Sequence, residues 1–354
     1  FILSLRATGE GHISSITFRS GVLDKDNNIS LDACSKFVTA PDAYPNQWYE
    51  KQLFATKSHE LNIANSFSEQ IFSDFPGDFS LSDLINKTEF YLNSGGNAND
   101  AESKRTAIAL IELAQSNYEV LYHPEVELSE RVIFPYAPNE RNGIEDARFV
   151  AFSDEAGVLT YYATYTAYNG RMIFPQLLET KDFLHFKINT LNGDEVYNKG
   201  MALFPRKINE KYVMLSRQDN ENLFIMFSDH IHFWREKQLL LAPENPWELI
   251  QIGNCGSPIE TEKGWLVITH GVGPMRKYCL GAFLLDLDDP TKVIGRIKDP
   301  ILCPIENERE GYVPNVVYSC GCIVSGKDLI IPYAMSDYCT GFATIPLAEL
   351  LGVF

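Results

Sequence analysis

Two carboxylates and a guanidinium stand close together in the segment NGIEDARFV, residues 142–150. Successive side chains of a β-strand point to opposite faces, so Asp146, and not Glu145, is expected to share a face with Arg148. A carboxylate beside a guanidinium forms either a structural ion pair or a site acid with a tuned pKa. Because structural pairs are common, this segment taken alone favours the ion pair. The rest of the chain has to decide between the two.

Polar side chains also end five short apolar segments that resemble one another: FILSLRA, YYATYTA, YVMLSRQ, WLVITHG and LIIPYAMSD. The polar ends are Arg6, Tyr165 with Thr166, Arg217, His270 and Asp337. Polar residues follow most strands, so one such end carries little weight by itself. Two arginines, a histidine and an aspartate at matching places together indicate a shared binding site.

The last four of these segments recur roughly every 50 to 65 residues, somewhat more than the length of a common four-stranded propeller blade. Short strands separated by turn sequences such as NG, SD and DDP lie between them. The sequence therefore predicts an all-β fold, a five-bladed β-propeller. Its innermost strands are expected to carry the five polar ends to one mouth of a central channel.

One region departs from the strand pattern. Between residues 80 and 122, apolar residues recur at helical spacing, and Ser80 with Asp83 forms a capping pattern. The stretch NSGGNAND, residues 93–100, separates two such helices. We expect residues 1–354 to form a single propeller domain, with a helical insertion at about 74–122 between the first blade and the acidic segment. The insertion should pack outside the channel.

Composition narrows the class of partner. The formal net charge of −17 argues against nucleic acid or an anionic membrane as the main partner, because clustered Lys and Arg drive such binding. No apolar run reaches the roughly 18 residues that span a bilayer. The seven cysteines and seven histidines lack metal-ligand spacing, so we expect no metal, mostly buried thiols and a reducing, cytoplasmic location. The chain opens inside an apolar strand, which suggests that residues precede Phe1. Whether the protein forms a homo-oligomer is not determined by the sequence.

Several motifs together resemble glycoside hydrolase family 130, a family of β-mannoside phosphorylases and β-mannosidases on a five-bladed propeller. They are NGIEDARFV, YTAYNGR, NKGMALFPRKINEKYVMLSRQD, IGNCGSPIETEKGWLVITHGV, GYVPNVVYSCG and YAMSDYCTGFATI, in the order expected of the family. The resemblance runs from about residue 142 to the C-terminus, and FILSLRATGEGHISSITF resembles the first-blade strand. Ala147 replaces the usual proline, and YAMSD replaces YGAAD, so the acceptor specificity is blurred.

The resemblance implies roles for individual residues. Asp146 matches the general acid, and Arg6 and Asp337 match residues that hold the transferred mannose ring. The positions that match phosphate ligands of the phosphorylases are Arg171, Lys199, His270 and Tyr278. Around them, Arg148, Arg217 and Tyr165 are expected to contact the substrate. The family needs no metal and no organic cofactor, so inorganic phosphate would be the co-substrate of a β-mannoside oligosaccharide.

Three functions remain open at this point. A phosphorylase uses phosphate as the nucleophile and needs one acid and several cations, which Arg171, Lys199 and His270 would supply. A β-1,2-mannosidase needs a second carboxylate to activate water, and Glu260, Glu306 and Glu310 are the acids to consider. A non-catalytic glycan-binding propeller would have lost the acid. The cationic residues favour inverting phosphorolysis of a β-mannoside to α-mannose 1-phosphate, whereas the linkage and the acceptor sugar stay undetermined.

Overall fold

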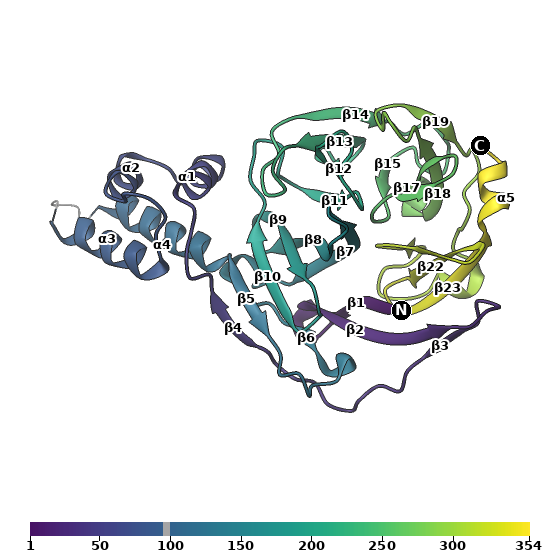
Figure 1. Ribbon diagram of the computed structural model, residues 1–354, viewed down its shortest axis with the longest axis horizontal. Coiled ribbons are helices and arrows are strands. Elements are labelled where there is room, and N and C mark those ends of the chain that lie inside the picture. Colours follow the sequence, from purple (N-terminus) through teal and green to yellow (C-terminus); the bar gives the residue numbers. More distant parts are fainter. Residues whose placement is uncertain (95–99) are drawn as a thin grey trace.

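The computed structural model describes residues 1–94 and 100–354, and strands dominate it (Figure 1). The α-helices are α1 (Lys51–Glu60), α2 (Ser66–Ser73), α3 (Leu81–Ser94), α4 (Ala101–Gln115) and α5 (Leu347–Gly352). Short 3-10 turns are η1 (Glu10–His12), η3 (Leu128–Glu130), η4 (Pro138–Glu140), η5 (Pro274–Arg276) and η6 (Glu306–Glu308). Within the described residues, no helix is both long and apolar enough to cross a membrane.

The strands of the described residues form five antiparallel sheets. The first holds β1 (Ile2–Thr8), β2 (Ser14–Leu23), β3 (Ile29–Leu31) and β6 (Val132–Ile133). The second has the order β4 (Asp42–Pro45), β5 (Tyr118–Leu121), β10 (His185–Thr190), β9 (Ile173–Thr180), β8 (Leu159–Tyr168) and β7 (Ile144–Ser153).

The other three sheets follow along the chain. The third holds β11 (Lys199–Leu203), β12 (Tyr212–Arg217), β13 (Leu223–Ser228) and β14 (Lys237–Leu241). The fourth holds β15 (Gln251–Asn254), β16 (Ile259–Thr261), β17 (Gly264–Val272), β18 (Tyr278–Leu285) and β19 (Val293–Arg296). The fifth holds β20 (Val317–Tyr318), β21 (Ile323–Ser325), β22 (Asp328–Met335) and β23 (Cys339–Pro346). Figure 1 shows the five sheets following one another around a common centre.

Each of the five similar apolar segments lies in a different sheet, on β1, β8, β12, β17 and β22. The expectation that all five would be innermost strands is wrong for four of them. Strands β8, β12, β17 and β22 each have hydrogen-bonded neighbours on both sides. One edge of each of these four sheets is formed by the strand next to them, β7, β11, β15 or β20. The edge strands therefore also contribute to the site.

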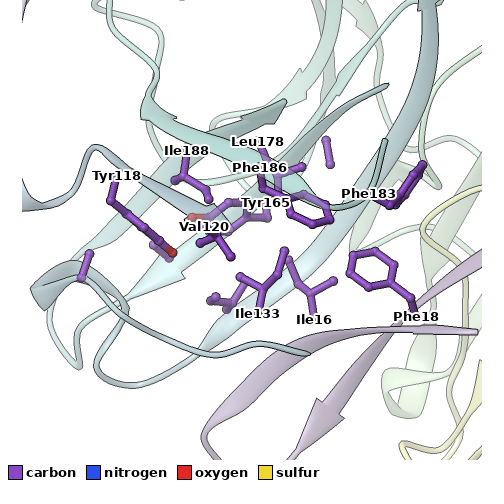
Figure 2. Packing of buried hydrophobic residues seen from close by; sticks show 14 of the residues in the cluster. Ile16, Phe18, Tyr118, Val120, Ile133, Tyr165, Leu178, Phe183, Phe186 and Ile188 are labelled. Carbon is purple, nitrogen blue, oxygen red and sulfur yellow. The ribbon is translucent and has the colours of Figure 1, made fainter. Parts of the chain in front are cut away.

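Consecutive sheets pack against each other through apolar side chains. In the core between the first and second sheets, Phe18 of β2 stacks on Phe186 of β10 at 5.7 Å between ring centroids (Figure 2). Similar cores join the second sheet to the third, the third to the fourth and the fourth to the fifth. The first and fifth sheets meet at the Phe1–Phe342 ring contact, at 6.4 Å, and where Asn27 donates to Asp328 at 2.6 Å.

The helices α1–α4 have a core of their own and extend outward beside β4 and β5 (Figure 1). Ser80 and Asp83 cap α3 reciprocally, because each backbone N–H donates to the other side chain, at 2.9 and 3.1 Å. The helical region differs from the expected 74–122, since α1 and α2 precede residue 74 and β5 occupies 118–121. The separating stretch expected at 93–100 lies partly outside the described residues.

The cysteines also differ from expectation. Cys279 and Cys303 form a disulfide, so they are not thiols. Among the free cysteines, Cys255 is buried, Cys320 and Cys322 are half-buried, and Cys34 and Cys339 are exposed. The pair brings the start of β18 to the loop after β19, two segments that are 24 residues apart.

Candidate active site

A β-bulge presents Asp146 at the edge of the second sheet. On β7, Glu145 faces Thr166 and Arg148 faces Thr164, so Asp146 and Ala147 together oppose a single residue of β8. Asp146 has a φ of 53°, in the left-handed region that Asp tolerates better than most side chains. Such backbone conformations concentrate at functional sites. The simple alternation of side chains between the two faces of β7 therefore breaks at Asp146.

The hydroxyl of Tyr318, at the end of β20, lies between Asp146 and Arg148. Arg148 Nη2 donates to Tyr318 Oη at 2.7 Å, and Tyr318 Oη donates to Asp146 Oδ2 at 3.1 Å. The described residues contain no direct ion pair between Asp146 and Arg148. The two side chains do converge, as expected from the sequence, but on a shared neutral partner rather than on each other.

Glu145 is the acid that forms the ion pairs. Arg6 Nη2 of β1 lies 3.1 Å from Glu145 Oε1, and Lys199 Nζ of β11 lies 2.5 Å from Glu145 Oε2. Arg6 Nη1 approaches Asp146 Oδ1 only to 3.9 Å. Of the two neighbouring acids, Glu145 thus joins three sheets structurally, whereas Asp146, which lines a cavity, is left with weaker pairing.

Two buried guanidiniums lie beside this acid. Arg217, the last residue of β12, is 7% exposed, and within the described part of the chain its Nε and Nη1 have no hydrogen-bond partner. Arg148 is 2% exposed, and its Nε is also unpartnered there. Burial and the like charge of Arg148 lower the pKa of Arg217, yet a guanidinium stays protonated in proteins. A buried charge without a partner is unfavourable, so Arg217 is the group here that a bound anion would stabilise most.

His270 on β17 lies next to the two guanidiniums. The residue is 1% exposed, and burial, Arg217 and Arg148 together lower its pKa well below the usual range. The imidazole is therefore neutral without a bound anion, and it can serve an anion as an N–H donor. Tyr278 of β18 stacks parallel to it at 6.0 Å, and Tyr318 meets it edge-on at 4.9 Å. A side chain at Gly253 would meet His270 and Arg217, since its Cβ would lie 2.5 Å from His270 Cε1 and 3.3 Å from Arg217 Cδ.

A cavity of about 760 Å³ opens beside Asp146. Its polar wall includes Arg6, Asp146, Tyr318 and Asp337, while apolar side chains of the first, second and fifth sheets line the remainder. Asp337 lies exposed in the turn between β22 and β23, with a φ of 53°. A mannose-sized ligand could contact Arg6, Asp146 and Asp337 from this cavity.

Tyr165 lies outside the site, whereas Arg171 lies at its margin. Tyr165 is 3% exposed and donates to the buried carboxylate of Glu140, so it belongs to the core beneath the site and cannot stack on a sugar. Arg171 lies in the exposed turn between β8 and β9, and in the described residues its side chain forms no hydrogen bond or ion pair. Because Gly170 packs against Asn142, that turn lies beside the start of β7.

Sequence reasoning missed two residues, Tyr318 and Glu140. Tyr318 ends a two-residue strand inside GYVPNVVYSCG, and its place at a strand end was the available signal. Glu140 is fully buried and accepts from the hydroxyls of Tyr118 and Tyr165 and from the backbone of Tyr136 and Ala137. Burial raises the pKa of Glu140. No local pattern marked it as buried.

The described residues contain no cluster of three or more His, Cys, Asp or Glu side chains that could hold a metal ion. The polar groups at the site are the guanidiniums of Arg6, Arg148 and Arg217, the Tyr318 hydroxyl, and the carboxylates of Glu145, Asp146 and Asp337. The site thus offers an acid with only weak ion pairing in Asp146, several donors for an anion and an adjoining cavity.

Comparison with known proteins gives a consistent picture. The profile described as beta-1,4-mannooligosaccharide phosphorylase, of glycoside hydrolase family 130, matches residues 100–354. A 1,2-beta-oligomannan phosphorylase of Thermoanaerobacter sp. (strain X514) is 37% identical over 230 residues, 64% of this chain and 75% of that protein. A beta-1,2-mannobiose phosphorylase of Listeria innocua is 33% identical over 228 residues, 62% of each chain.

Solved structures agree on the fold. The structure of a beta-1,2-mannobiose phosphorylase from Listeria innocua, in complex with beta-1,2-mannobiose, superimposes with a TM-score of 0.57 at 21% identity, over 99% of this chain and 92% of that one. The profile match covers well over half of the sequence and includes all of the site except Arg6. The chain therefore belongs to glycoside hydrolase family 130.

Proposed function

We propose that this protein phosphorolyses β-mannosides with inversion, converting a β-manno-oligosaccharide and phosphate into α-mannose 1-phosphate and a shortened acceptor. The observation that carries the proposal is the buried Arg217, whose Nε and Nη1 have no partner in the described structure, beside Arg148 and Asp146. Phosphate supplies the missing negative charge. The matched relatives, which are named as phosphorylases of β-mannosides, support the same reaction.

Phosphate would be held by Arg217, with Lys199 and the neutral His270 as further donors and Tyr278 and Arg171 at the edge. Arginine suits this place because its planar fork can bind two phosphate oxygens at once. Lys199 Nζ is shared with Glu145, so its contribution should be smaller than that of Arg217. Phosphate is the only co-substrate that the proposal needs, with no metal and no organic cofactor.

The mannose ring would lie against Arg6 and Asp337, with Asp146 next to the leaving oxygen. A phosphate oxygen attacks the anomeric carbon, the glycosidic bond breaks, and its electron pair stays on the leaving oxygen. Asp146 protonates that oxygen. A single displacement on a β-linkage gives the α-phosphate.

For the fold, we propose a five-bladed β-propeller in one domain, with residues 51–115 as a helical addition outside it. The five sheets in chain order and the apolar cores between consecutive sheets support this arrangement. A cytoplasmic location stays a prediction, and the Cys279–Cys303 disulfide argues against a reducing compartment.

The hydrolase alternative would need a second carboxylate at the distance of one water from Asp146. Glu260, one candidate, accepts hydrogen bonds from Nε and Nη2 of Arg206. It lies opposite Trp265, near the start of β17, whereas His270 lies near the end of that strand. Glu306 and Glu310 are exposed loop acids without a described link to Asp146. The cationic site therefore favours phosphorolysis.

The test is a product assay with a panel of β-1,2- and β-1,4-linked mannobioses. Turnover should be near zero in phosphate-free buffer, rise saturably with phosphate and yield α-mannose 1-phosphate. The reverse reaction should extend an acceptor from that donor. Free mannose released at full rate without phosphate would reject the proposal and promote the mannosidase.

A further inference from the structure

Tyr318 is, within residues 1–94 and 100–354, the side chain that forms hydrogen bonds to both Asp146 and the buried Arg148. Its hydroxyl lies 2.7 Å from Arg148 Nη2 and 3.1 Å from Asp146 Oδ2. We propose that Tyr318 is a positioning residue, which separates Asp146 from Arg148 and fixes the carboxyl oxygen that delivers the proton. The proposal rests on the function proposed above, because it assigns how the acid of that reaction is kept usable.

The hydrogen-bond directions follow from the donor inventory. Arg148 can only donate, so Tyr318 Oη accepts from it, and the single hydroxyl proton is left for Asp146 Oδ2. Burial raises the pKa of Tyr318 well above its usual range, so the hydroxyl keeps that proton. With Oδ2 occupied as an acceptor, the carboxyl proton of Asp146 resides on Oδ1. This oxygen faces Arg6 at 3.9 Å, beside the cavity.

The separation matters because a general acid must be protonated before it acts. A direct ion pair with Arg148 would stabilise the carboxylate and hold the acid ionised. The Tyr318 hydroxyl satisfies the Arg148 donor with a neutral group instead. The cation thus stays in place for the anion site without neutralising the acid beside it.

Other ionisable groups lie around Asp146 and enter any pH dependence. They are Arg6 of β1, Glu145 of β7, Lys199 of β11, Arg217 of β12, Cys255 after β15, Cys320 after β20 and Asp337 after β22, with His270 of β17 next to Arg217. Glu145 is already paired with Arg6 and Lys199, and His270 is neutral. Among the described residues, the Tyr318 hydroxyl forms side-chain hydrogen bonds with Arg148 and Asp146 and with none of these groups, so removing it is aimed at the contact with Arg148.

In Tyr318→Phe, Arg148 Nη2 loses its acceptor and turns to Asp146 Oδ2. The acid then releases its proton at lower pH, so the high-pH limb of the kcat profile should move about one unit toward acid. Phosphorolysis of β-mannobiose should slow about ten- to a hundredfold, which is at or below the roughly hundred- to ten-thousandfold contribution of a general acid, because Asp146 itself is kept. An aryl β-mannoside whose phenolate leaves without protonation should lose less than about threefold.

The matched control is Tyr91→Phe on α3. Tyr91 also donates to an aspartate beside a cation, since Asp74 Oδ2 lies 2.9 Å from both Tyr91 Oη and Lys87 Nζ, but on the helical region. This variant should leave both substrates and the pH profile unchanged. The aryl mannoside also reports whether the site of Tyr318→Phe is folded.

Equal losses on both substrates with an unmoved pH limb would reduce Tyr318 to a structural residue. An unchanged rate on β-mannobiose would remove the proposed role altogether. Neither result touches the assigned reaction, which fails only if the wild-type enzyme turns over without phosphate. The two proposals therefore fail by different measurements.

Discussion

Replacing Arg217 by methionine tests the anion site, because the change should have opposite effects with and without phosphate. Without an anion, Arg217 is a buried charge next to the like charge of Arg148. Replacing a buried ion pair by apolar side chains is neutral or stabilises by about 1 to 4 kcal/mol, and removing a buried charge that has no counter-charge should act in the same direction. With phosphate, the same exchange removes two donors from the bound dianion.

The size of the effect can be estimated from chain length. For 354 residues the unfolding entropy near 60 °C is about 0.7 kcal/mol/K, so 1 kcal/mol changes the melting temperature by about 1.4 °C. Phosphate at a hundredfold excess over its dissociation constant stabilises by about 2.7 kcal/mol, or about 4 °C. We expect the wild type to show this increase, and Arg217→Met to show almost none while melting at or above the wild type in phosphate-free buffer.

Thermal melting in a phosphate titration measures both effects, with kinetics of mannose 1-phosphate release alongside. Arg206→Met is the matched control, since Arg206 is a half-exposed arginine paired with Glu260 near Trp265. The control should keep the full phosphate-dependent increase. A normal increase in Arg217→Met, with an unchanged Michaelis constant for phosphate, would refute the assignment of the anion site.

Three further predictions follow from the same geometry. Asp146→Asn should abolish phosphorolysis yet leave sugar binding within about tenfold, measured by calorimetry, because the amide keeps the shape and cannot deliver a proton; turnover in this variant would move the acid elsewhere. Lys199→Ala should raise the Michaelis constant for phosphate more than that for the sugar, and by less than Arg217→Met, since Lys199 is partly exposed and shared with Glu145; a larger effect on the sugar would contradict it. Burial raises the pKa of Glu140, so its contribution to stability is fully present below pH about 4.5 and is lost as pH rises through the raised pKa. The melting temperature of Glu140→Gln should therefore increase relative to that of the wild type as pH rises through this range. Melting temperatures of the two proteins that change in parallel with pH would disprove it.

Much of the site was predictable because the family motifs and the polar residues at strand ends select candidate site residues without any knowledge of which residues they contact. Asp146, Arg217 and His270 lie together as the sequence indicated. Period-two alternation would also have excluded Tyr165, because it puts Tyr165 on the opposite face from Thr164 and Thr166, which lie opposite Arg148 and Glu145 of β7, and Tyr165 packs in the core. That error came from weighing residue type above the face of the strand.

The rest depends on contacts between distant segments. Tyr318 and Asp146 are 172 residues apart, and no local pattern foretells that they meet. The bulge at Asp146 has no glycine to mark it. In the helical region, α1 has few apolar residues and α2 spans only eight, so neither gives a clear helical period, whereas the longer α3 and α4 do.

The left-handed backbone at Asp146 also limits how this enzyme could change in evolution. Among the side chains that a single base change can bring to an aspartate codon, asparagine and glycine fit a φ of 53° well, whereas β-branched valine does not. Asparagine also keeps an oxygen for Tyr318. One transition in the first codon base would therefore change Asp146 to asparagine, which should give a folded protein that binds mannosides without cleaving them. We expect sugar-binding descendants of this family to arise more readily by this loss of the acid than by substitutions that disturb the fold.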